Sequence, residues 1–450
     1  MINKLNYTTM KNLNYILILV LSITLYSCES YTEDLNTNPN EFSSAPPELI
    51  IGQAQLGWMH LATSNGARYA GIFMNQFSGE DRQYNVVNQY STTAGDYDDL
   101  WQDAYVSGIA QAKLTEKLAL ANGNAKLAGI AQICEAAIYG EMTTLFGDIP
   151  FTEAIDPDNS STPKYDAQAD VLSGVQAILD NAISNVSNAP GSLYGGNRLS
   201  TETTWAKIAY SLKARYYLIA KDYTNALANA KKGISDSAGS LMTQHTTSTN
   251  TENLYFQFTV DERDGYLGAT NSHLVKLLNG TTARAITTPG DSDRYAHYFT
   301  PIAGTDNIIL NVTNTGYFAE TAPMNIISYE EVKLIEAEAA NRIGNGSDVT
   351  AFNEVRTHLA AEYNASFPLT ASASGSTALL TEILEEKYIT LVGELQPFHD
   401  VRRTNNMLNI PPKTGTTIPQ RFIYPQIEID ANPNTPSPLP TLFDKTPINN

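Results

Sequence analysis

The feature that most constrains the fold of this chain is a helical pattern in which small residues recur among bulky ones. It is clearest over residues 205–219 and 223–230, which are separated by a break at Lys221-Asp222. The small residues of this pattern include Ala209, Ala226 and Ala230. Small side chains let two helices approach closely, so the pattern predicts a tightly packed helical pair.

A second unit of the same kind occupies residues 329–340 and 351–356. Both units match the tetratricopeptide pattern, in which paired helices stack on neighbouring pairs. Residues 231–328 separate them in the sequence, so they do not form a simple tandem array. We expect the two pairs to stack as repeat-like units nonetheless.

Further helices are expected on apolar periodicity over 49–61, 98–112, 127–145 and 166–186. Trp101 and Trp205 sit at helical spacing and are interpreted as core residues. Residues 238–325 are loop-rich, with short strand-like runs such as 307–312, and the proline-rich residues 408–450 are expected to lack a helix. The fold class predicted is mainly α: a helical scaffold with tetratricopeptide-like helix pairs and long irregular loop-rich insertions.

The first residues indicate export and lipidation. Two lysines precede an apolar run over 15–25, which suits a signal peptide and is shorter than the roughly 20 residues that span a bilayer. The run ends in Leu25-Tyr-Ser-Cys28, typical of a bacterial lipobox. We therefore expect residues 1–27 to be a lipoprotein signal peptide, Cys28 to carry the lipid, 28–48 to be a flexible tether, and 49–450 to form a single domain.

Charge and cysteine content exclude several classes of function. The formal net charge is −19, which disfavours binding to nucleic acid or to anionic headgroups, so membrane attachment is assigned to the lipid alone. The second cysteine, Cys134, lies on an apolar helical face and is interpreted as a buried small hydrophobe. With Cys28 lipidated, no disulfide framework remains.

Six stretches with distinctive residues follow one another along the chain: Asp34–Asn40, Glu141–Pro150, Ser328–Ala339, Glu385–Glu394, Phe398–Arg403 and Arg421–Asn434. In this order they resemble outer-membrane lipoproteins of the SusD/RagB family. The resemblance implies a SusD-like fold and a surface lipoprotein of the outer membrane, facing outward. It also implies that the protein binds an oligosaccharide or oligopeptide and delivers it to a SusC-like TonB-dependent barrel. Because such proteins bind without catalysis, Glu386, Arg402 and Arg403 are interpreted as buried or capping ion pairs.

No enzyme signature accompanies the resemblance. The sequence contains no zinc-protease, nucleophile-elbow, P-loop or dinucleotide motif. The histidines form no pair four residues apart, and the calcium-loop-like start over 156–160 lacks the required glycine and closing glutamate, so no metal or other cofactor is expected. The alternative function is a surface glycan-active enzyme or an adhesion module.

Two clusters that combine aromatic rings with polar side chains are candidate ligand-binding regions. The first lies in the predicted loop 77–90 and the second in the loop-rich middle. Rings stack on sugars while amides and guanidiniums bind hydroxyls, although the same rings could simply pack the loops onto the scaffold. The candidate residues are Arg82, Tyr84, Asn88 and Tyr90, and Arg294, Tyr295 and Tyr298.

Overall fold

A computed structural model describes residues 45–156, 161–188, 199–200 and 204–450. The expected signal peptide, Cys28 and nearly all of the expected tether lie outside the described residues. Residues 47–450 form one compact unit. Within the described ranges, no helix has the length and apolar character needed to cross a membrane.

The first helices of this unit gather around α3, which packs against α4, η2, α7 and α8. The predicted helices over 49–61 and 98–112 are confirmed, the second with a π-helical stretch inside it. Its Gly108 meets Gly57 of α3 so closely that a Cβ on Gly57 would lie 2.7 Å from the Gly108 Cα. The elements are α3 (Pro47–Thr63), α4 (Asn65–Phe73), α5 (Arg82–Asn88), η1 (Ala94–Tyr97), α6 (Asp98–Gln102), η2 (Asp103–Ile109) and α7 (Ala110–Ala121).

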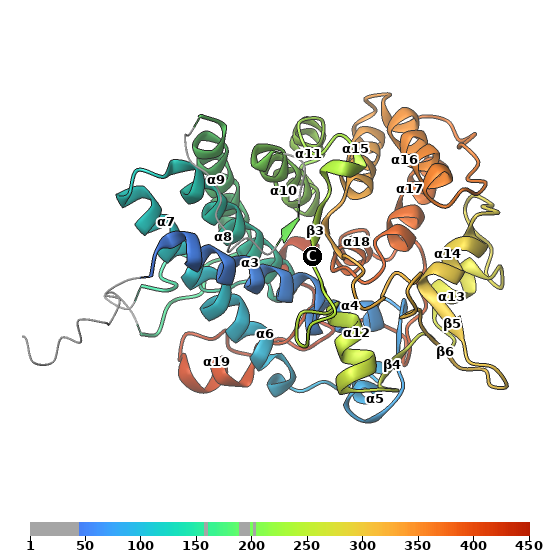
Figure 1. Ribbon diagram of the computed structural model, residues 1–450, viewed down its shortest axis with the longest axis horizontal. Helices are drawn as coiled ribbons and strands as arrows, with labels where there is room; N and C mark the ends of the chain where they lie inside the picture. The colour runs from blue at the N-terminus through green and yellow to red at the C-terminus, as the bar shows by residue number, and fades with distance from the viewer. Residues whose placement is uncertain (1–44, 157–160, 189–198, 201–203) are drawn as a thin grey trace, which may run out of the picture. The chain divides into compact units, whose positions relative to one another are not determined.

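The predicted helix pairs are confirmed, and they stack side by side in one row (Figure 1). Each helix packs on the next from α7 through α11, and α11 then packs directly on α15, although residues 231–328 lie between them in the sequence. Helices α16 and α17 both pack against α15. The helices after α7 are α8 (Ala125–Phe146), α9 (Gln168–Asn188), α10 (Trp205–Ile219), α11 (Tyr223–Ala230), α15 (Tyr329–Ile343), α16 (Asp348–Glu362) and α17 (Thr377–Thr390).

The insertion between α11 and α15 is loop-rich, as expected, but it contains more short elements than the sequence predicts. Residues 291–298, predicted as loop, form helix α14, and the strand-like run at 307–312 contains β6. The elements are η3 (Ser237–Gly239), β3 (Leu241–Thr243), α12 (Leu254–Phe256), η4 (Gln257–Glu262), β4 (Leu267–Gly268), α13 (His273–Leu278), α14 (Asp291–Tyr298), β5 (Phe299–Pro301), β6 (Ile308–Leu310) and β7 (Asn325–Ile327).

Small antiparallel sheets tie the insertion to the scaffold. Strand β1 (Ser78–Gly79) pairs with β4, with Ser78 opposite Gly268. Strand β3 lies between β2 (Leu199–Ser200) and β7, and β5 pairs with β6. The β1–β4 pair brings the segment before α5 next to the insertion.

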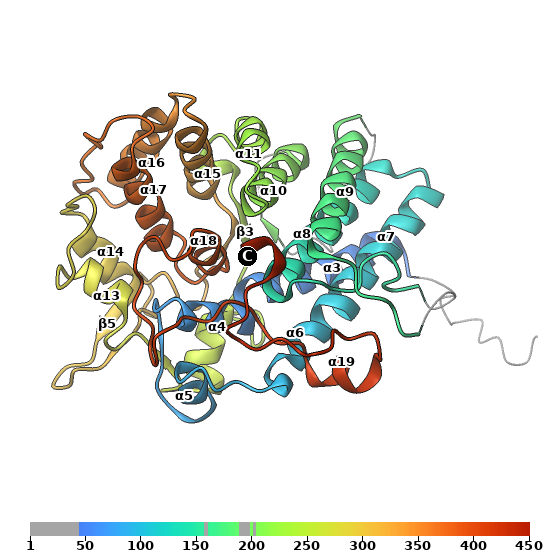
Figure 2. The same cartoon turned by 180° about the vertical axis from the view of Figure 1, so that it is seen from behind.

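The C-terminal segment folds back along the helices, as Figure 2 shows. It follows α18 (Gln396–Arg403), and the Phe422 N–H donates to the Leu145 carbonyl at 2.9 Å. The expectation that residues 408–450 lack a helix is wrong, because α19 (Gln426–Ala431) forms beside α6 and η5 (Pro447–Asn449) follows. The Ile427 N–H donates to the Asp98 carboxylate at 3.1 Å, which fixes α19 there.

The predicted core residues are buried. Trp101 and Trp205 are 5% and 7% exposed, and Cys134 is a fully buried free thiol of α8. Many of the largest fully buried side chains are tyrosines, among them Tyr97, Tyr139 and Tyr388. Much of the tyrosine content therefore packs helices together.

Candidate ligand-binding site

A cavity of about 320 Å³ opens where the start of α4 meets α5, α6 and η4. We call it the α4–α5 cavity. Its walls come from parts of the chain almost 200 residues apart, because the β1–β4 pairing places the insertion beside α5. Asn65, Arg68, Tyr84 and Phe258 form its floor, and its rim includes Gln83, Asp99, Glu262 and Arg263.

The floor of the α4–α5 cavity is a packed cluster of Arg68, Tyr84 and Phe258. The Tyr84 and Phe258 ring centroids lie 4.6 Å apart, and the Arg68 guanidinium lies 4.1 Å from the Phe258 centroid. Arg68 Nε donates to the Tyr84 hydroxyl at 2.7 Å, and that hydroxyl donates to Asn65 Oδ1 at 3.0 Å. Burial raises the pKa of Tyr84, and Arg68 opposes this shift, so the phenol stays neutral and keeps its donated hydrogen bond.

The rim of the cavity is polar and exposed. Gln83 and Asp99 stand on α5 and α6, and Glu262 and Arg263 face them from the end of η4. His60 Nδ1 lies 3.8 Å from the Asp103 carboxylate on the same side. The cavity thus offers carboxylate acceptors, amide groups that can donate or accept, and a guanidinium donor, a set that suits a ligand with many hydroxyl or amide groups.

Of the first predicted cluster, only Tyr84 lines the cavity. Arg82 is exposed and lies 5.9 Å from the Tyr266 centroid, and Asn88 Oδ1 accepts from the Gly79 N–H at 3.2 Å. Tyr90 is 7% exposed, and its hydroxyl accepts from the Lys413 N–H at 2.8 Å. Both rings are buried, because α5 and the turn that follows it pack against the scaffold, so here the rings do pack the predicted loop onto the scaffold.

The second predicted cluster is mostly core. Arg294 is fully buried and forms ion pairs with Asp291 and Glu386, so it cannot reach a ligand. Tyr298 is 2% exposed, and Tyr295 is half-buried with its ring centroid 6.0 Å from that of Phe299. The segment 291–298 is helical rather than loop, and its inner face packs inward, although Tyr298 lines the second cavity described below.

The predicted structural roles of the motif charges are confirmed in two of three cases. Glu386 is fully buried and pairs with three arginines, and Arg403 pairs with Glu338 and Asp400. Arg402 makes no ion pair among the described residues. Its guanidinium donates instead to the Thr144 and Gln420 carbonyls at 3.1 and 2.9 Å, so it satisfies backbone acceptors near the end of α8.

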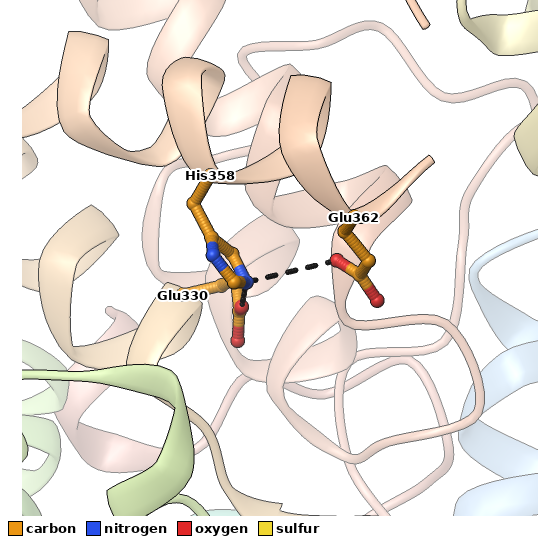
Figure 3. Close-up of side chains that lie close together, drawn as sticks. All are labelled: Glu330, His358 and Glu362. Atoms are coloured by element: carbon orange, nitrogen blue, oxygen red, sulfur yellow. Dashed lines mark ion pairs between the residues drawn. The ribbon is translucent and has the colours of Figure 1, made fainter. Parts of the chain in front are cut away.

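A second cavity, of about 310 Å³, lies beside α15 and α16. It contains Glu330, His358 and Glu362, which the sequence analysis did not single out (Figure 3). His358 and Glu362 are four residues apart on α16, a spacing that places them on one face. A search for histidine–carboxylate pairs at that spacing would have found them, whereas a search for histidine pairs does not.

Comparison with known proteins identifies the family of the chain. A family model for SusD-like proteins, described as "Starch-binding associating with outer membrane", matches residues 39–425. The chain belongs to the SusD-like family. The resemblance to the SusD/RagB family and the predicted helical fold class are confirmed. No curated protein sequence matches the chain.

Solved SusD-like structures share the fold at low sequence identity. A SusD/RagB family protein from Bacteroides thetaiotaomicron is 21% identical, with 87% of this chain and 95% of that chain covered and a TM-score of 0.67. A SusD homologue from Bacteroides uniformis is 17% identical over 88% and 98%, with a TM-score of 0.69. A chitin-binding SusD homologue from Flavobacterium johnsoniae is 15% identical over 90% and 97%, with a TM-score of 0.67.

Proposed function

We propose that this SusD-like protein binds an oligosaccharide or oligopeptide at the outer membrane and delivers it to a SusC-like TonB-dependent barrel. The observation that carries the proposal is the family match over residues 39–425, which includes all the helices of the scaffold up to α18. Two solved structures of similar fold, one of them a SusD homologue, are described as chitin-binding. A β-linked amino-sugar oligomer is therefore the first ligand to test.

The α4–α5 cavity is the site we assign to that ligand. Its rim carries Gln83, Asp99 and Arg263, which can bind hydroxyl and acetamido groups, and its floor is held rigid by the Arg68–Tyr84–Asn65 hydrogen bonds. Rigid polar groups bind with a small loss of side-chain entropy. The apolar rings of the floor are largely covered by one another, so hydrogen bonds rather than stacking supply most of the recognition.

Calorimetric titration with chito-oligosaccharides, malto-oligosaccharides and short peptides tests the site. Gln83→Ala and Asp99→Ala should each weaken binding by about 2- to 10-fold, as expected for one lost hydrogen bond of about 0.5–1.5 kcal/mol. Asn85→Ala is the matched control, because Asn85 is exposed on the same helix and does not line the cavity. If all three variants bound the ligand as tightly as the wild type, the ligand would have to bind elsewhere.

Membrane attachment is assigned to a lipid on Cys28. The thiol of this residue is the acceptor that the Leu25-Tyr-Ser-Cys28 pattern predicts. Cys28→Ala should release the protein into the soluble fraction of the cell. Lipid labelling that persists in this variant would contradict the assignment.

Delivery to a transporter requires a stable partner in the membrane. We expect mild detergent extraction, followed by affinity purification of the lipidated protein, to recover a TonB-dependent barrel in near-equal amount. The ligand would then be enclosed between the two proteins. Recovery of the SusD-like protein alone under these conditions would remove the transporter from the proposal.

A further inference from the structure

Two carboxylates and an imidazole converge in the second cavity, on the side where α15 begins and α16 ends (Figure 3). His358 Nε2 lies 2.6 Å from Glu330 Oε1 and 3.7 Å from Glu362 Oε2. One potential ligand atom from each of the three side chains lies within 4.8 Å of the others. Both helices belong to the rigid scaffold, so the backbone positions of the three residues are fixed by packing.

The charge of this cluster is not balanced by permanent cations. Among the described residues, no lysine or arginine forms an ion pair with Glu330 or Glu362, whose ion pairs are to His358, although Arg294 acts from a distance to lower the pKa of Glu362. The neighbouring Lys333 pairs instead with Glu336 and Glu354. Two carboxylates therefore share one imidazole, which carries at most one positive charge.

The same cavity contains an unsatisfied polar group. Tyr317 lines it, and the Tyr317 hydroxyl is buried without a hydrogen-bond partner in the part of the chain that the structure describes. Buried hydroxyls are nearly always partnered by protein, water or a bound species. Burial is the main cause of the raised pKa of Tyr317, followed by Glu394, Tyr298 and Tyr255, with Glu362 contributing least. The cavity thus has a set of potential ligand atoms and, in its wall, an unpartnered hydroxyl.

We propose that Glu330, His358 and Glu362 bind a divalent transition-metal ion of the zinc type. Imidazole and carboxylate together suit zinc, and its ligands sit about 2.0–2.2 Å from the ion, hence about 3.4 Å from one another. The two measured separations from His358 bracket that value, so small side-chain rotations are enough to bind the ion. Binding displaces the proton that His358 Nε2 shares with Glu330 and releases it to solvent.

Three protein ligands leave a fourth coordination position open. In zinc sites of this kind, water or an oxygen of a bound molecule takes that position. Here it would face a cavity lined by Tyr298, Tyr317 and Tyr363.

Titration of the tag-free full chain with ZnCl₂, followed by calorimetry, tests the proposal without any glycan, so its failure is independent of the proposed function. We expect one zinc ion per chain. His358→Ala and Glu362→Gln should each weaken binding by more than about 10-fold, at least as much as the loss of a residue that only orients a ligand. Glu354→Gln on the same helix and His245→Ala are matched controls that should keep full affinity, because neither residue reaches the cavity.

A second measurement covers the case in which His358→Ala unfolds. Glu362 is 47% exposed at its side chain, so Glu362→Gln should fold normally, as circular dichroism can verify. Co²⁺ in place of zinc should give visible absorption bands in the wild type that are lost in Glu362→Gln. Absence of zinc binding to the wild type, or binding that both variants retain, would overturn the proposal.

Discussion

The Glu386 cluster and the Glu330–His358–Glu362 cluster are built from similar groups but differ in their balance of charge. Glu386 and its partners Arg294 and Arg356 are fully buried, and Arg284 joins them at 3.3 Å. The other cluster is partly exposed, with side-chain exposures of 11% for Glu330, 24% for His358 and 47% for Glu362. In the first, three guanidiniums pair with three carboxylates, those of Glu386, Asp291 and Glu385, whereas in the second, two carboxylates share one titratable base.

This difference distinguishes a carboxylate that stays ionised for structural reasons from groups whose protonation can change. Burial alone would raise the pKa of Glu386, but Arg294, Arg284 and Arg356 lower it below its ordinary value, so this carboxylate stays ionised and paired. The pKa of His358 is raised by its hydrogen bond to Glu330, and that of Glu362 is raised by burial and by Glu330. Glu386 is thus a fixed charge of the fold, whereas His358 and Glu362 are the groups that would give up a proton to a bound metal ion.

Glu386→Gln should give the largest effect. Removing the charge leaves three buried guanidiniums without their common partner, and breaking such a buried pair typically costs about 3–5 kcal/mol of unfolding free energy. Urea unfolding measures the loss. Glu354→Gln, which removes a half-exposed partner of Lys333, should cost less than about 1 kcal/mol. Equal effects in the two variants would contradict the distinction between the clusters.

The second-largest expected effect is a loss of stability in acid, where buried carboxylates become protonated. Burial favours the neutral form of Glu141, yet His399 and Arg215 lower its pKa from 4.5 to about 2. A lowering of this size contributes about 3 kcal/mol, which is present above the unfolded pKa and is lost as pH falls through the folded value. Stability should therefore fall steeply between about pH 4 and pH 2, as chemical unfolding at a series of pH values can measure. In Glu141→Gln, which has no charge to lose, this part of the slope should be absent.

His358→Gln should have a smaller effect with the opposite pH dependence. Because the pKa of His358 is raised in the folded state, its contribution is full below the unfolded pKa of about 6.5 and is lost as pH rises through the folded value. The loss of stability in His358→Gln should thus be larger at pH 5.5 than at pH 8.5, and at most about 1 kcal/mol. Urea unfolding with a chelator present measures it, and a difference that grows with pH would contradict the assignment.

Arg82→Ala should have the smallest effect. The Arg82 side chain is 75% exposed, and its partner Asp81 is also exposed, so unfolding free energy should change by less than about 0.5 kcal/mol. Ligand affinity should also be unchanged, because Arg82 does not line the α4–α5 cavity. A clear loss of affinity in this variant would indicate that the ligand contacts the cluster first predicted from the sequence and not the α4–α5 cavity.

Local patterns in the sequence determined the scaffold. The apolar periodicity over 127–145 and the small residues of 205–230 predicted α8, α10 and α11, because helix formation and close packing depend on residues a few positions apart. The ordered motifs likewise indicated the family and the burial of Glu386 and Arg403. These features needed no knowledge of which distant segments meet.

Only the tertiary structure decided where a ligand or an ion can bind. The segments around Tyr84 and Arg294 have the mix of aromatic and polar residues expected of a binding loop, yet α5 and α14 pack inward and bury these two side chains. The α4–α5 cavity joins Arg68 to Phe258, and the second cavity joins Glu330 to His358, through contacts between different elements. The physical reason is that burial and charge balance depend on neighbours brought together by folding, which periodicity along the chain does not encode.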